Sequence, residues 1–324
     1  MRRVLVTGGS GFIGTNLIDA LVERGDSLIN LDINPPKKES HRSFWRECDI
    51  LDFERTLSFF DEFKPTHLIH LAARTDVLSN ELDDYKVNTA GTDNILRCIQ
   101  LTPDVERVII TSSQFAFAPP GLPAHDEEYN PIGAYGMSKV LSEKATRTAG
   151  LNCIWTITRP TNIWGPWHPR YPKEFWLVLK GGLYFHPGGK FTIRSYGYVK
   201  NIVYHMMKIL EAAPAVVNGK LYYLGDPPIP LIEWANGFSL VITGKPVRVV
   251  PRPLLALLAA TGSVLTAAGI PFPITRSRYR SMTEDYFSPV ETTITAFGQP
   301  PYALEEGIKE TVDWLNAFWN GEFS

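Results

Sequence analysis

The first half of the chain alternates between short apolar runs and longer segments with the period of an amphipathic helix. The apolar runs predict buried strands, and they cover residues 3–8, 27–32, 66–73, 107–113 and 152–160. Helical patterns fill the intervals, at residues 16–25, 52–63, 87–101 and 134–150. Strands that alternate with helices form βαβ units and a parallel sheet. We therefore predict an α/β fold built on a doubly wound parallel sheet.

The pattern changes in the second half of the chain. Residues 164–191 are rich in Gly, Pro and aromatic side chains, which is typical of loops that line a binding cleft. A helix at 198–212 and a strand at 220–225 then resume the earlier pattern. Residues 226–284 form a separate section with more helix, and residues 304–319 form a final amphipathic helix. The sequence therefore predicts a second part that is mostly helical.

Residues 253–275 contain no charged side chain, and arginines flank them on both sides. An apolar stretch of about 20 residues is long enough to cross a bilayer. This one is diluted by small, polar and helix-breaking residues: Gly262, Ser263, Thr266, Pro271 and Pro273. We therefore predict a buried or surface-seeking helical hairpin, with peripheral contact to a membrane as the alternative.

The composition is that of an ordinary soluble globular protein, with 44% hydrophobic and 20% charged residues. The formal net charge of -2 provides no overall field that would recruit nucleic acid or anionic lipid. Three scattered cysteines, Cys48, Cys98 and Cys153, indicate free thiols in a reducing compartment and no metal site. We expect a cytoplasmic protein.

Gly8, Gly11 and Gly14 lie three residues apart, between the first predicted strand and the first predicted helix. The first permits a tight turn, the second lets the backbone approach a pyrophosphate, and the third lets helix pack closely on strand. The N-terminus of the helix then offers N–H groups to the phosphates. In this position the pattern predicts a dinucleotide-binding turn.

Asp32 ends the second predicted strand. An acidic residue at this point accepts hydrogen bonds from the adenosine ribose and repels a 2′-phosphate, so we predict NAD as the cofactor in preference to NADP. Asp49 has two interpretations: it accepts a bond from the adenine amino group, or it caps the helix that follows.

These features predict how the chain is divided into domains. Residues 1–165, completed by about 192–226, are predicted to form a NAD-binding Rossmann domain. Residues 166–191 and 227–324 are predicted to form a smaller, mostly helical substrate-binding domain.

Tyr135 and Lys139 lie four residues apart, and therefore on one face of the predicted helix at 134–150. This spacing occurs by chance in many sequences, but here it stands among five other motifs. The six, in chain order, are TGGSGFIG (7–14), HLAA (70–73), NTAGTDNIL (88–96), TSS (111–113), YGMSK (135–139) and RPTNIWGP (159–166). With them the chain resembles the extended short-chain dehydrogenase/reductases, and within these the NAD-dependent nucleotide-sugar epimerase/dehydratase family.

The resemblance implies roles for individual residues. Ser113, Tyr135 and Lys139 would form the catalytic triad, in which Tyr135 is the acid/base and Lys139 binds the nicotinamide ribose. Residues expected to contact NAD are Gly8, Gly11, Phe12, Ile13, Gly14, Asp32, Asp49, Ile50, Leu71, Ala72, Ala73, Asn88, Thr111, Tyr135, Lys139 and Pro160. Residues expected to contact the substrate are Arg74, Gln114, Phe115, Asn162, Trp167 and Arg194.

Departures from the family pattern narrow the choice of reaction. Sugar-nucleotide dehydratases of the family carry an Asp-Glu pair where this chain has Gln114 and Phe115, which disfavours 4,6-dehydration. Asp32 disfavours a reductase that exchanges NADPH. We therefore favour an epimerase that keeps its NAD and acts on a nucleotide sugar by transient hydride transfer.

A second resemblance supports an alternative. Residues 248–287 are similar to the C-terminal part of the 3β-hydroxysteroid and sterol-carboxylate dehydrogenases, with an apolar segment followed by ITR and DYF. A NAD-dependent dehydrogenase of a sterol-like alcohol is therefore the alternative function. The arginines at 276, 278 and 280 would either meet the phosphates of a nucleotide sugar or form a solvated basic strip.

The family resemblance also implies a homodimer, because many members pair through the helices that carry NTAGTDNIL and YGMSKVLSEKA. The expected partners are this second copy and a small-molecule substrate, without nucleic acid. A cofactor-binding regulator is a third interpretation, which the intact Ser-Tyr-Lys set disfavours.

Overall fold

The computed structural model describes residues 2–270, 272 and 274–321. By its contacts the chain divides into two compact units. Unit 1 comprises residues 1–163, 197–226 and 288–301, and unit 2 comprises residues 164–196, 227–287 and 302–324. Residues 288–301, which the sequence grouped with the substrate-binding part, have their contacts in unit 1.

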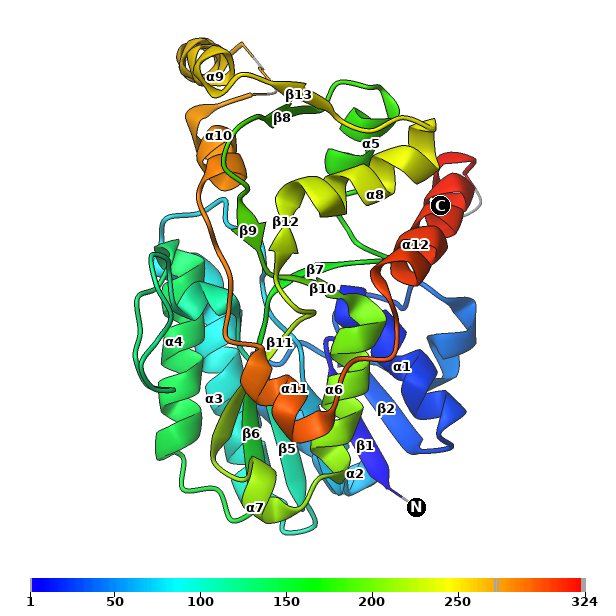
Figure 1. Ribbon diagram of the computed structural model, residues 1–324. Coiled ribbons are helices and arrows are strands. Elements are labelled where there is room, and N and C mark those ends of the chain that lie inside the picture. Colours follow the sequence, from blue (N-terminus) through cyan, green and yellow to red (C-terminus); the bar gives the residue numbers. More distant parts are fainter. Residues whose placement is uncertain (1, 271, 273, 322–324) are drawn as a thin grey trace. The chain divides into compact units, whose positions relative to one another are not determined.

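Unit 1 is built on a sheet of seven parallel strands in the order β11-β6-β5-β4-β1-β2-β3 (Figure 1). The strands are β1 (Arg3–Thr7), β2 (Ser27–Asp32), β3 (Trp45–Glu47), β4 (His67–His70), β5 (Arg107–Thr111), β6 (Ile154–Pro160) and β11 (Lys220–Leu224). The strand order reverses between β1 and β4, which is where doubly wound folds bind their ligands. The predicted α/β fold with a Rossmann-type parallel sheet is confirmed.

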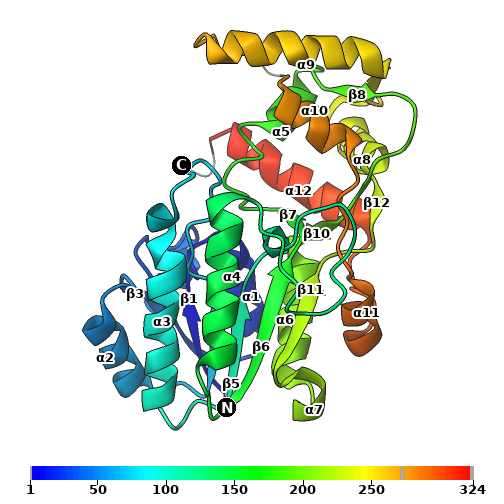
Figure 2. The same cartoon turned by 90° about the vertical axis from the view of Figure 1, so that its left-hand side faces the viewer.

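Helices cover both faces of this sheet (Figure 2). The long helices of the unit are α1 (Phe12–Glu23), α2 (Phe53–Phe63), α3 (Lys86–Leu101), α4 (Gly133–Thr148) and α6 (Val199–Glu211). The shorter ones are α7 (Pro214–Val217), α11 (Glu291–Phe297) and the 3-10 turns η1 (Glu39–Phe44), η2 (Leu82–Tyr85) and η3 (Gln114–Ala116).

Alternation along β1 shows how the two layers of core form. Val4 and Val6 pack with Leu17 of α1 and Met206 of α6, whereas Leu5 points to the opposite face, among residues of α2 and α3. Successive side chains of a strand face opposite ways, so strands that are apolar throughout bury both faces. This explains why runs such as VIIT predicted the strands correctly.

The sequence missed β3 because this strand has three residues, two of them exposed and charged, and so carries no apolar run. The structure also contradicts one of the two interpretations of Asp49, namely that it caps the helix α2. Asp52 is the N-cap, and its side chain accepts a hydrogen bond from the N–H of Arg55 at 3.0 Å. Asp49 is exposed and accepts a bond from the N–H of Leu51.

Unit 2 is mostly helical. Its helices are α5 (Phe175–Lys180), α8 (Leu231–Thr243), α9 (Arg252–Ala267), α10 (Arg276–Thr283) and α12 (Leu304–Trp319). Two short sheets accompany them, a parallel pair of β8 (Phe185–Pro187) with β13 (Arg248–Val250) and an antiparallel pair of β9 (Ile193–Arg194) with β12 (Ile229–Pro230). The chain passes between the units at β7 (Asn162–Trp164) and β10 (Tyr196–Tyr198).

The aromatic residues of 164–191 form the core of unit 2 to a large extent. Trp164 and Trp176 are fully buried, as is Trp234 of α8, and Phe238 packs within 5.3 Å of the rings of both Trp164 and Trp176. The interpretation of this stretch as the lining of a cleft is therefore wrong for these tryptophans. Their composition could not distinguish a core from a cleft, because both favour large apolar rings.

The apolar segment at 253–275 lies mainly in one helix, α9, and α10 begins after the segment ends. Two helices do pack together here, as in the predicted hairpin, but only α9 belongs to the apolar segment and α10 follows it. Among the described residues, no helix combines the length and the apolar character that a membrane span needs. Pro271 and Pro273 lie outside the described residues.

Candidate active site

The turn between β1 and α1 is shaped by close backbone contacts. Gly8 has a φ of +74°, and a Cβ there would lie 2.5 Å from the backbone nitrogen of Ala72. A Cβ on Gly14 would lie 2.4 Å from the Cα of Gly9. At Gly11 a Cβ would meet, among the described residues, only the carbonyl oxygen of Gly8 at 3.1 Å. The backbone is therefore accessible at the N-terminus of α1, as a bound pyrophosphate requires.

Asn30 holds this turn against β2, although the sequence analysis did not select it. Its Oδ1 accepts a hydrogen bond from the N–H of Gly9 at 2.8 Å, and its Nδ2 donates to the Oγ of Ser10 at 3.0 Å. The side chain is fully buried. The available signal was a polar residue in the middle of a buried apolar strand, where it needs a specific partner.

Asp32 lies at the end of β2, next to the turn. One carboxylate oxygen accepts from the N–H of Ser10 at 3.0 Å, and the other accepts from the N–H of Asn34 at 2.9 Å. Burial raises the pKa of this carboxyl, although the backbone bonds oppose the shift. Each oxygen has a second lone pair, so the group can also accept bonds from ribose hydroxyls. The chemistry of Asp32 and the glycine turn thus fits a dinucleotide with a free 2′-hydroxyl.

A chain of buried hydrogen bonds runs from the turn through the sheet. Ala72 donates its N–H to Thr7 Oγ1, which lies 2.7 Å from His70 Nδ1, and His70 Nε2 lies 3.1 Å from Thr92 Oγ1. Thr92 gives its hydroxyl hydrogen to the carbonyl oxygen of Asn88 at 2.8 Å. His70 must therefore donate from Nε2 and accept at Nδ1.

His70 acts as a neutral connector in this chain of bonds. Complete burial lowers its pKa to about 3, with a further contribution from the charge of Lys139. The direction of the bonds then specifies a single tautomer of His70. Through these bonds His70 links β1, β4 and α3. Like Asn30, His70 was a polar residue within an apolar strand, which is the signal that would have found it.

Asn88 connects the segment after β4 with α4. Its Oδ1 accepts from the N–H of Arg74 at 2.8 Å, and its Nδ2 donates to the carbonyl oxygen of Arg74 and to Ser138 Oγ. The guanidinium of Arg74 is exposed, and it bonds to Asp76 at 2.8 Å and to the backbone of Asp84. Asn88 therefore positions the backbone that contains Leu71, Ala72 and Ala73, which the sequence predicted to contact NAD.

Ser113 follows β5 and begins the turn η3. Its Oγ accepts from the N–H of Phe115 at 3.2 Å, which leaves the hydroxyl hydrogen for another acceptor. The ring of Phe115 packs edge-on against the ring of Tyr135, with centroids 5.9 Å apart. The backbone of Phe115 also accepts from the N–H of Ile132, just before α4. Short contacts through Phe115 thus join Ser113 to the start of the helix that carries Tyr135.

Lys139 lies one turn after Tyr135 on α4, and both are buried. The Nζ of Lys139 donates to the carbonyl oxygen of Thr111 at 2.9 Å, at the end of β5. Burial lowers the pKa of Lys139 to about 8, against the attraction of Glu143 on the next turn. A cation held near Tyr135 favours the phenolate form, which is the base that proton abstraction from an alcohol needs.

Gly136 permits the close approach of η3 to α4. A Cβ at this position would lie 2.4 Å from the carbonyl oxygen of Phe115, which belongs to the backbone and has little freedom to move. We expect Gly136→Ala to displace the segment of Ser113 and Phe115 from Tyr135. Thermal unfolding should show that stability falls by about 1–3 kcal/mol. Steady-state turnover should show that kcat falls at least tenfold.

Gly181→Ala is the matched control for this change, because its nearest contact would be an ordinary 3.5 Å and its backbone is right-handed. It should alter neither quantity. Wild-type stability and turnover in Gly136→Ala would contradict the positioning argument.

The remaining cofactor residues predicted from the sequence occupy several environments. Ile50 is buried in the core between the sheet and α2 and α3, and Pro160 ends β6 in a buried position. Phe12 and Ile13, at the start of α1, are partly exposed. The structure places Gln114 in the interior, where its Oε1 accepts from Ser288 Oγ at 3.2 Å.

Of the other residues expected to contact the substrate, Asn162 belongs to unit 1, whereas Trp167 and Arg194 belong to unit 2. Trp167 has a φ of +72°, and its ring lies 5.8 Å from that of Trp314. The guanidinium of Arg194 lies over the ring of Tyr286 at 5.4 Å and donates to the carbonyl oxygen of Glu284. A stacked, planar guanidinium of this kind is suited to bind a phosphate.

One turn after Lys139, and on the same side of α4, Glu143 forms a fully buried ion pair with Arg159 of β6, which the sequence analysis did not identify. Arg159 donates from Nε and Nη2 to the two carboxylate oxygens of Glu143, both at 2.8 Å. Ser112 also donates to Glu143, and Arg159 donates to the hydroxyl of Tyr223 at 2.7 Å. Burial alone would lower the pKa of Arg159, but its bonds and charge attraction to Glu143 raise it.

Comparison of the sequence with known proteins identifies a family and several relatives. A sequence model described as "NAD dependent epimerase/dehydratase family" matches residues 4–225. The chain is 30% identical over 260 residues to the 3β-hydroxysteroid dehydrogenase/Δ5→4-isomerase of Mycobacterium tuberculosis, a match that covers 73% of this chain and 68% of that protein. It is 25% identical to UDP-glucuronate 4-epimerase 4 of Arabidopsis thaliana, with 98% of this chain and 76% of that protein covered.

Solved structures show the same fold. The UDP-glucose 4-epimerase of Thermotoga maritima, solved with UDP-glucose, superposes with a TM-score of 0.75 at 22% identity, over 98% of this chain and 99% of the other. The UDP-glucose 4-epimerase of Thermus thermophilus, solved with NAD, gives a TM-score of 0.72 at 24% identity, over 97% and 99%.

Proposed function

Since this chain belongs to the NAD-dependent epimerase/dehydratase family, we propose that it is an epimerase that inverts one carbinol centre of a nucleotide sugar. NAD is its cofactor, and when bound it accepts a hydride from the carbinol carbon and returns it. The observation that carries the proposal is the face of α4 on which Tyr135 precedes the buried Lys139 by one turn.

Tyr135 removes the proton of the sugar hydroxyl as the carbon is oxidised, and gives it back on reduction. Lys139 supplies the positive charge that favours the Tyr135 phenolate, and it is held by Thr111. Ser113 donates its hydroxyl hydrogen to the same substrate oxygen, because its Oγ already accepts from Phe115. Inversion of the centre would require the keto sugar to turn in the site, so that its opposite face is presented before Tyr135 returns the proton.

The residues after Ser113 support an epimerase over a dehydratase. A 4,6-dehydration needs a carboxylic acid to protonate the leaving hydroxyl. Gln114 and Phe115 carry no acid, and the amide of Gln114 is buried against Ser288. Stacked on Tyr286, Arg194 in unit 2 supports the nucleotide-sugar substrate, since its guanidinium can bind a diphosphate.

A dehydrogenase of an apolar, sterol-like alcohol is the second candidate. Two observations favour it: the 30% identity to a 3β-hydroxysteroid dehydrogenase, and the apolar side chains that α9 exposes. The two candidates share the chemistry of Tyr135, Lys139 and Ser113. They differ in whether the hydride returns to the substrate or leaves as NADH.

Purified protein incubated with UDP- and GDP-hexoses should interconvert one pair of epimers without net formation of NADH. The reason is that the cofactor is restored in each cycle. The measurement is separation of the sugar nucleotides by chromatography, with absorbance at the NADH wavelength followed in parallel. Accumulation of NADH with 3β-hydroxysteroids, and no epimerisation, would favour the second candidate; no turnover with either panel would rule out both.

A further inference from the structure

Helix α9 exposes an apolar face. Leu257 and Val264 are 65% and 68% exposed, and Leu254 is 50% exposed. We define the α9 surface as these residues with Leu258 and Ile270. The spacing of Leu254, Leu257, Leu258 and Val264 along α9 places these four in one stripe, and Ile270 follows shortly after the helix ends. Large apolar side chains scattered singly over a surface are ordinary, whereas a contiguous stripe indicates a binding surface.

The opposite face of α9 is fixed in unit 2. Leu255 and Ala259 are buried, and a Cβ on Gly262 would lie 2.0 Å from the carbonyl oxygen of Ile274. The N–H of Arg276 donates to Ser263 Oγ at 2.8 Å, which attaches the start of α10 to the middle of α9. One face of α9 is therefore packed against the rest of unit 2, and this packing fixes the position of the exposed stripe on the other face.

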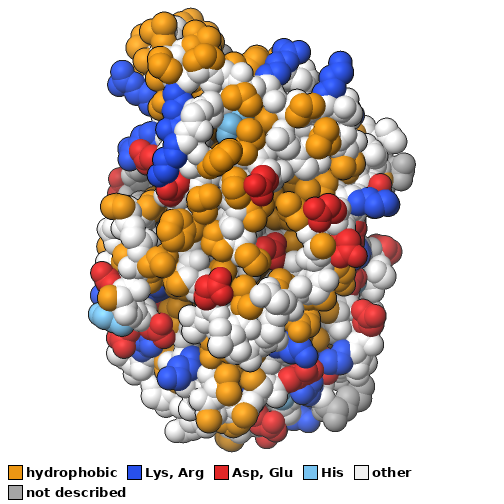
Figure 3. Space-filling model, viewed as in Figure 1, with side chains coloured by type: hydrophobic (Ala, Val, Ile, Leu, Met, Phe, Trp, Pro, Cys, Tyr) orange, Lys and Arg blue, Asp and Glu red, His pale blue; other side chains and the backbone are white. Residues whose placement is uncertain are grey.

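Basic residues flank the α9 surface along the chain, although one of them, Arg280, pairs with Glu284 at 2.9 Å. Residues 234–283 contain no Asp or Glu and six basic residues, although the whole chain has a net charge of -2. The six are Lys245, Arg248, Arg252, Arg276, Arg278 and Arg280. Figure 3 shows hydrophobic side chains gathered over α9, with Lys and Arg side chains beside them. The overall charge thus conceals a local cationic region around an apolar face.

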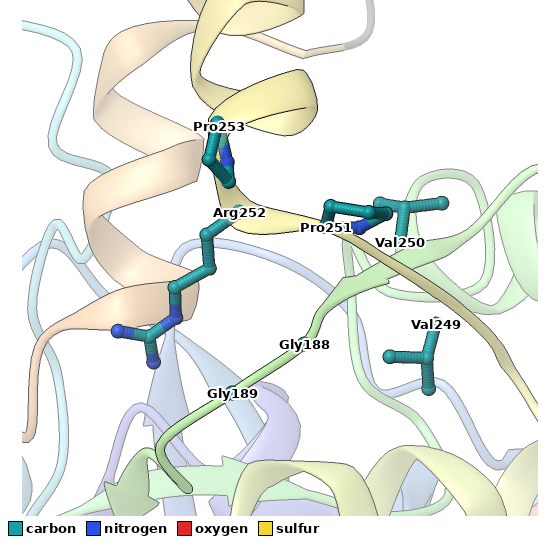
Figure 4. A pocket seen from close by; sticks show the side chains of 7 residues that line it. All are labelled: Gly188, Gly189, Val249, Val250, Pro251, Arg252 and Pro253. Carbon is teal, nitrogen blue, oxygen red and sulfur yellow. The ribbon is translucent and has the colours of Figure 1, made fainter.

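A shallow hollow, largely open to solvent, lies at the beginning of α9. It has a volume of about 510 Å³ and is lined by Gly188, Gly189 and residues 249–253 (Figure 4). The guanidinium of Arg252 is fixed there, because its Nη2 donates to the carbonyl oxygen of Lys190 at 2.6 Å. The hollow therefore combines an apolar lining with a cation, as the α9 surface does.

We propose that the α9 surface docks the protein peripherally on an anionic membrane. An amphipathic helix that lies at a bilayer surface inserts its apolar side chains among the acyl chains, while nearby cations attract acidic headgroups. Here the apolar stripe belongs to α9, and the cations come mainly from β13 and α10, to either side of it in the chain. If the α9 surface bound a second copy of the chain or an acidic protein instead, its binding would not depend on acidic lipid. The dependence of binding on vesicle composition therefore tests the proposal.

The test is co-sedimentation of the full chain with vesicles. We expect the protein to bind phosphatidylserine/phosphatidylcholine vesicles at 0.1 M salt or below. This binding should weaken at higher salt, because salt screens the cations. Binding to vesicles of phosphatidylcholine alone should be at least tenfold weaker. Val264→Asp and Leu257→Asp should each reduce the partition coefficient at least tenfold. Arg276→Glu and Arg278→Glu should each reduce it roughly fivefold or more.

Val22→Asp is the matched control, because Val22 is an exposed valine (44%) on α1 in the other unit. It should leave vesicle binding unchanged, and it should retain epimerisation of a water-soluble sugar nucleotide, as should Val264→Asp and Leu257→Asp. No binding to phosphatidylserine vesicles, equal binding to neutral ones, or a dimer that Val264→Asp dissociates without any vesicle binding would each overturn the proposal. None of these results would affect the proposed function.

Discussion

Tyr135→Phe is expected to lower kcat by about 10²–10⁴, the usual effect of losing a general acid/base. The change removes one oxygen and keeps the ring, so the packing against Phe115 and Tyr85, at 5.9 and 6.0 Å, is preserved. NAD content should therefore stay at the wild-type level while hydride transfer fails. Single-turnover kinetics, with NAD quantified after denaturation, measure both quantities.

Tyr222→Phe is the matched control. It also removes one buried hydroxyl from unit 1, here one that donates to the carbonyl oxygen of Val216 at 2.7 Å. It should cost some stability, about 1 kcal/mol, and leave kcat unchanged. If Tyr135→Phe retained activity within tenfold of the wild type, another group would have to be the acid/base.

Arg159→Met is expected to produce the largest loss of stability, about 3–5 kcal/mol, because it leaves the buried carboxylate of Glu143 without its cation. Both side chains of this pair are fully buried, so water cannot replace the lost partner. The midpoint of urea unfolding, followed by circular dichroism, should fall accordingly. The double variant Arg159→Met/Glu143→Leu should recover part of the loss, since it buries no unpaired charge.

The exposed pair of Lys309 and Asp313 provides the control, with side chains 77% and 62% accessible. Asp313→Asn should leave the unfolding midpoint unchanged, because solvent screens such pairs. A double variant as unstable as Arg159→Met would indicate that packing, and not the unpaired charge, determines the loss.

Local patterns predicted most of the secondary structure of unit 1, and also α12 of unit 2. β2 and α12 have the predicted bounds, and the bounds of α3 and α4 differ by two residues or fewer. These elements have strong periodicity and clear ends, and a period depends only on neighbours in the chain. β3 failed the same test because three residues are too few to show a period.

The sequence predicted some residues of the candidate site and failed to predict others. The glycine turn and the Tyr135–Lys139 spacing are visible in the sequence, since each depends on residues within one turn of chain. Asn30, His70, Glu143 and Arg159 were not selected, because their partners lie 16 or more residues away in the sequence. Only folding decides which distant group satisfies a buried polar atom.

The sequence by itself determined that this chain forms a parallel α/β sheet with a tight glycine turn after its first strand, because alternating periods and close-set glycines act locally. The tertiary structure decided three things that composition left open. It buried Trp164 and Trp176 as core, it enclosed Glu143 with Arg159, and it left one face of α9 exposed. Burial results from contacts between distant segments, so the same apolar run serves as core or as surface according to what packs against it.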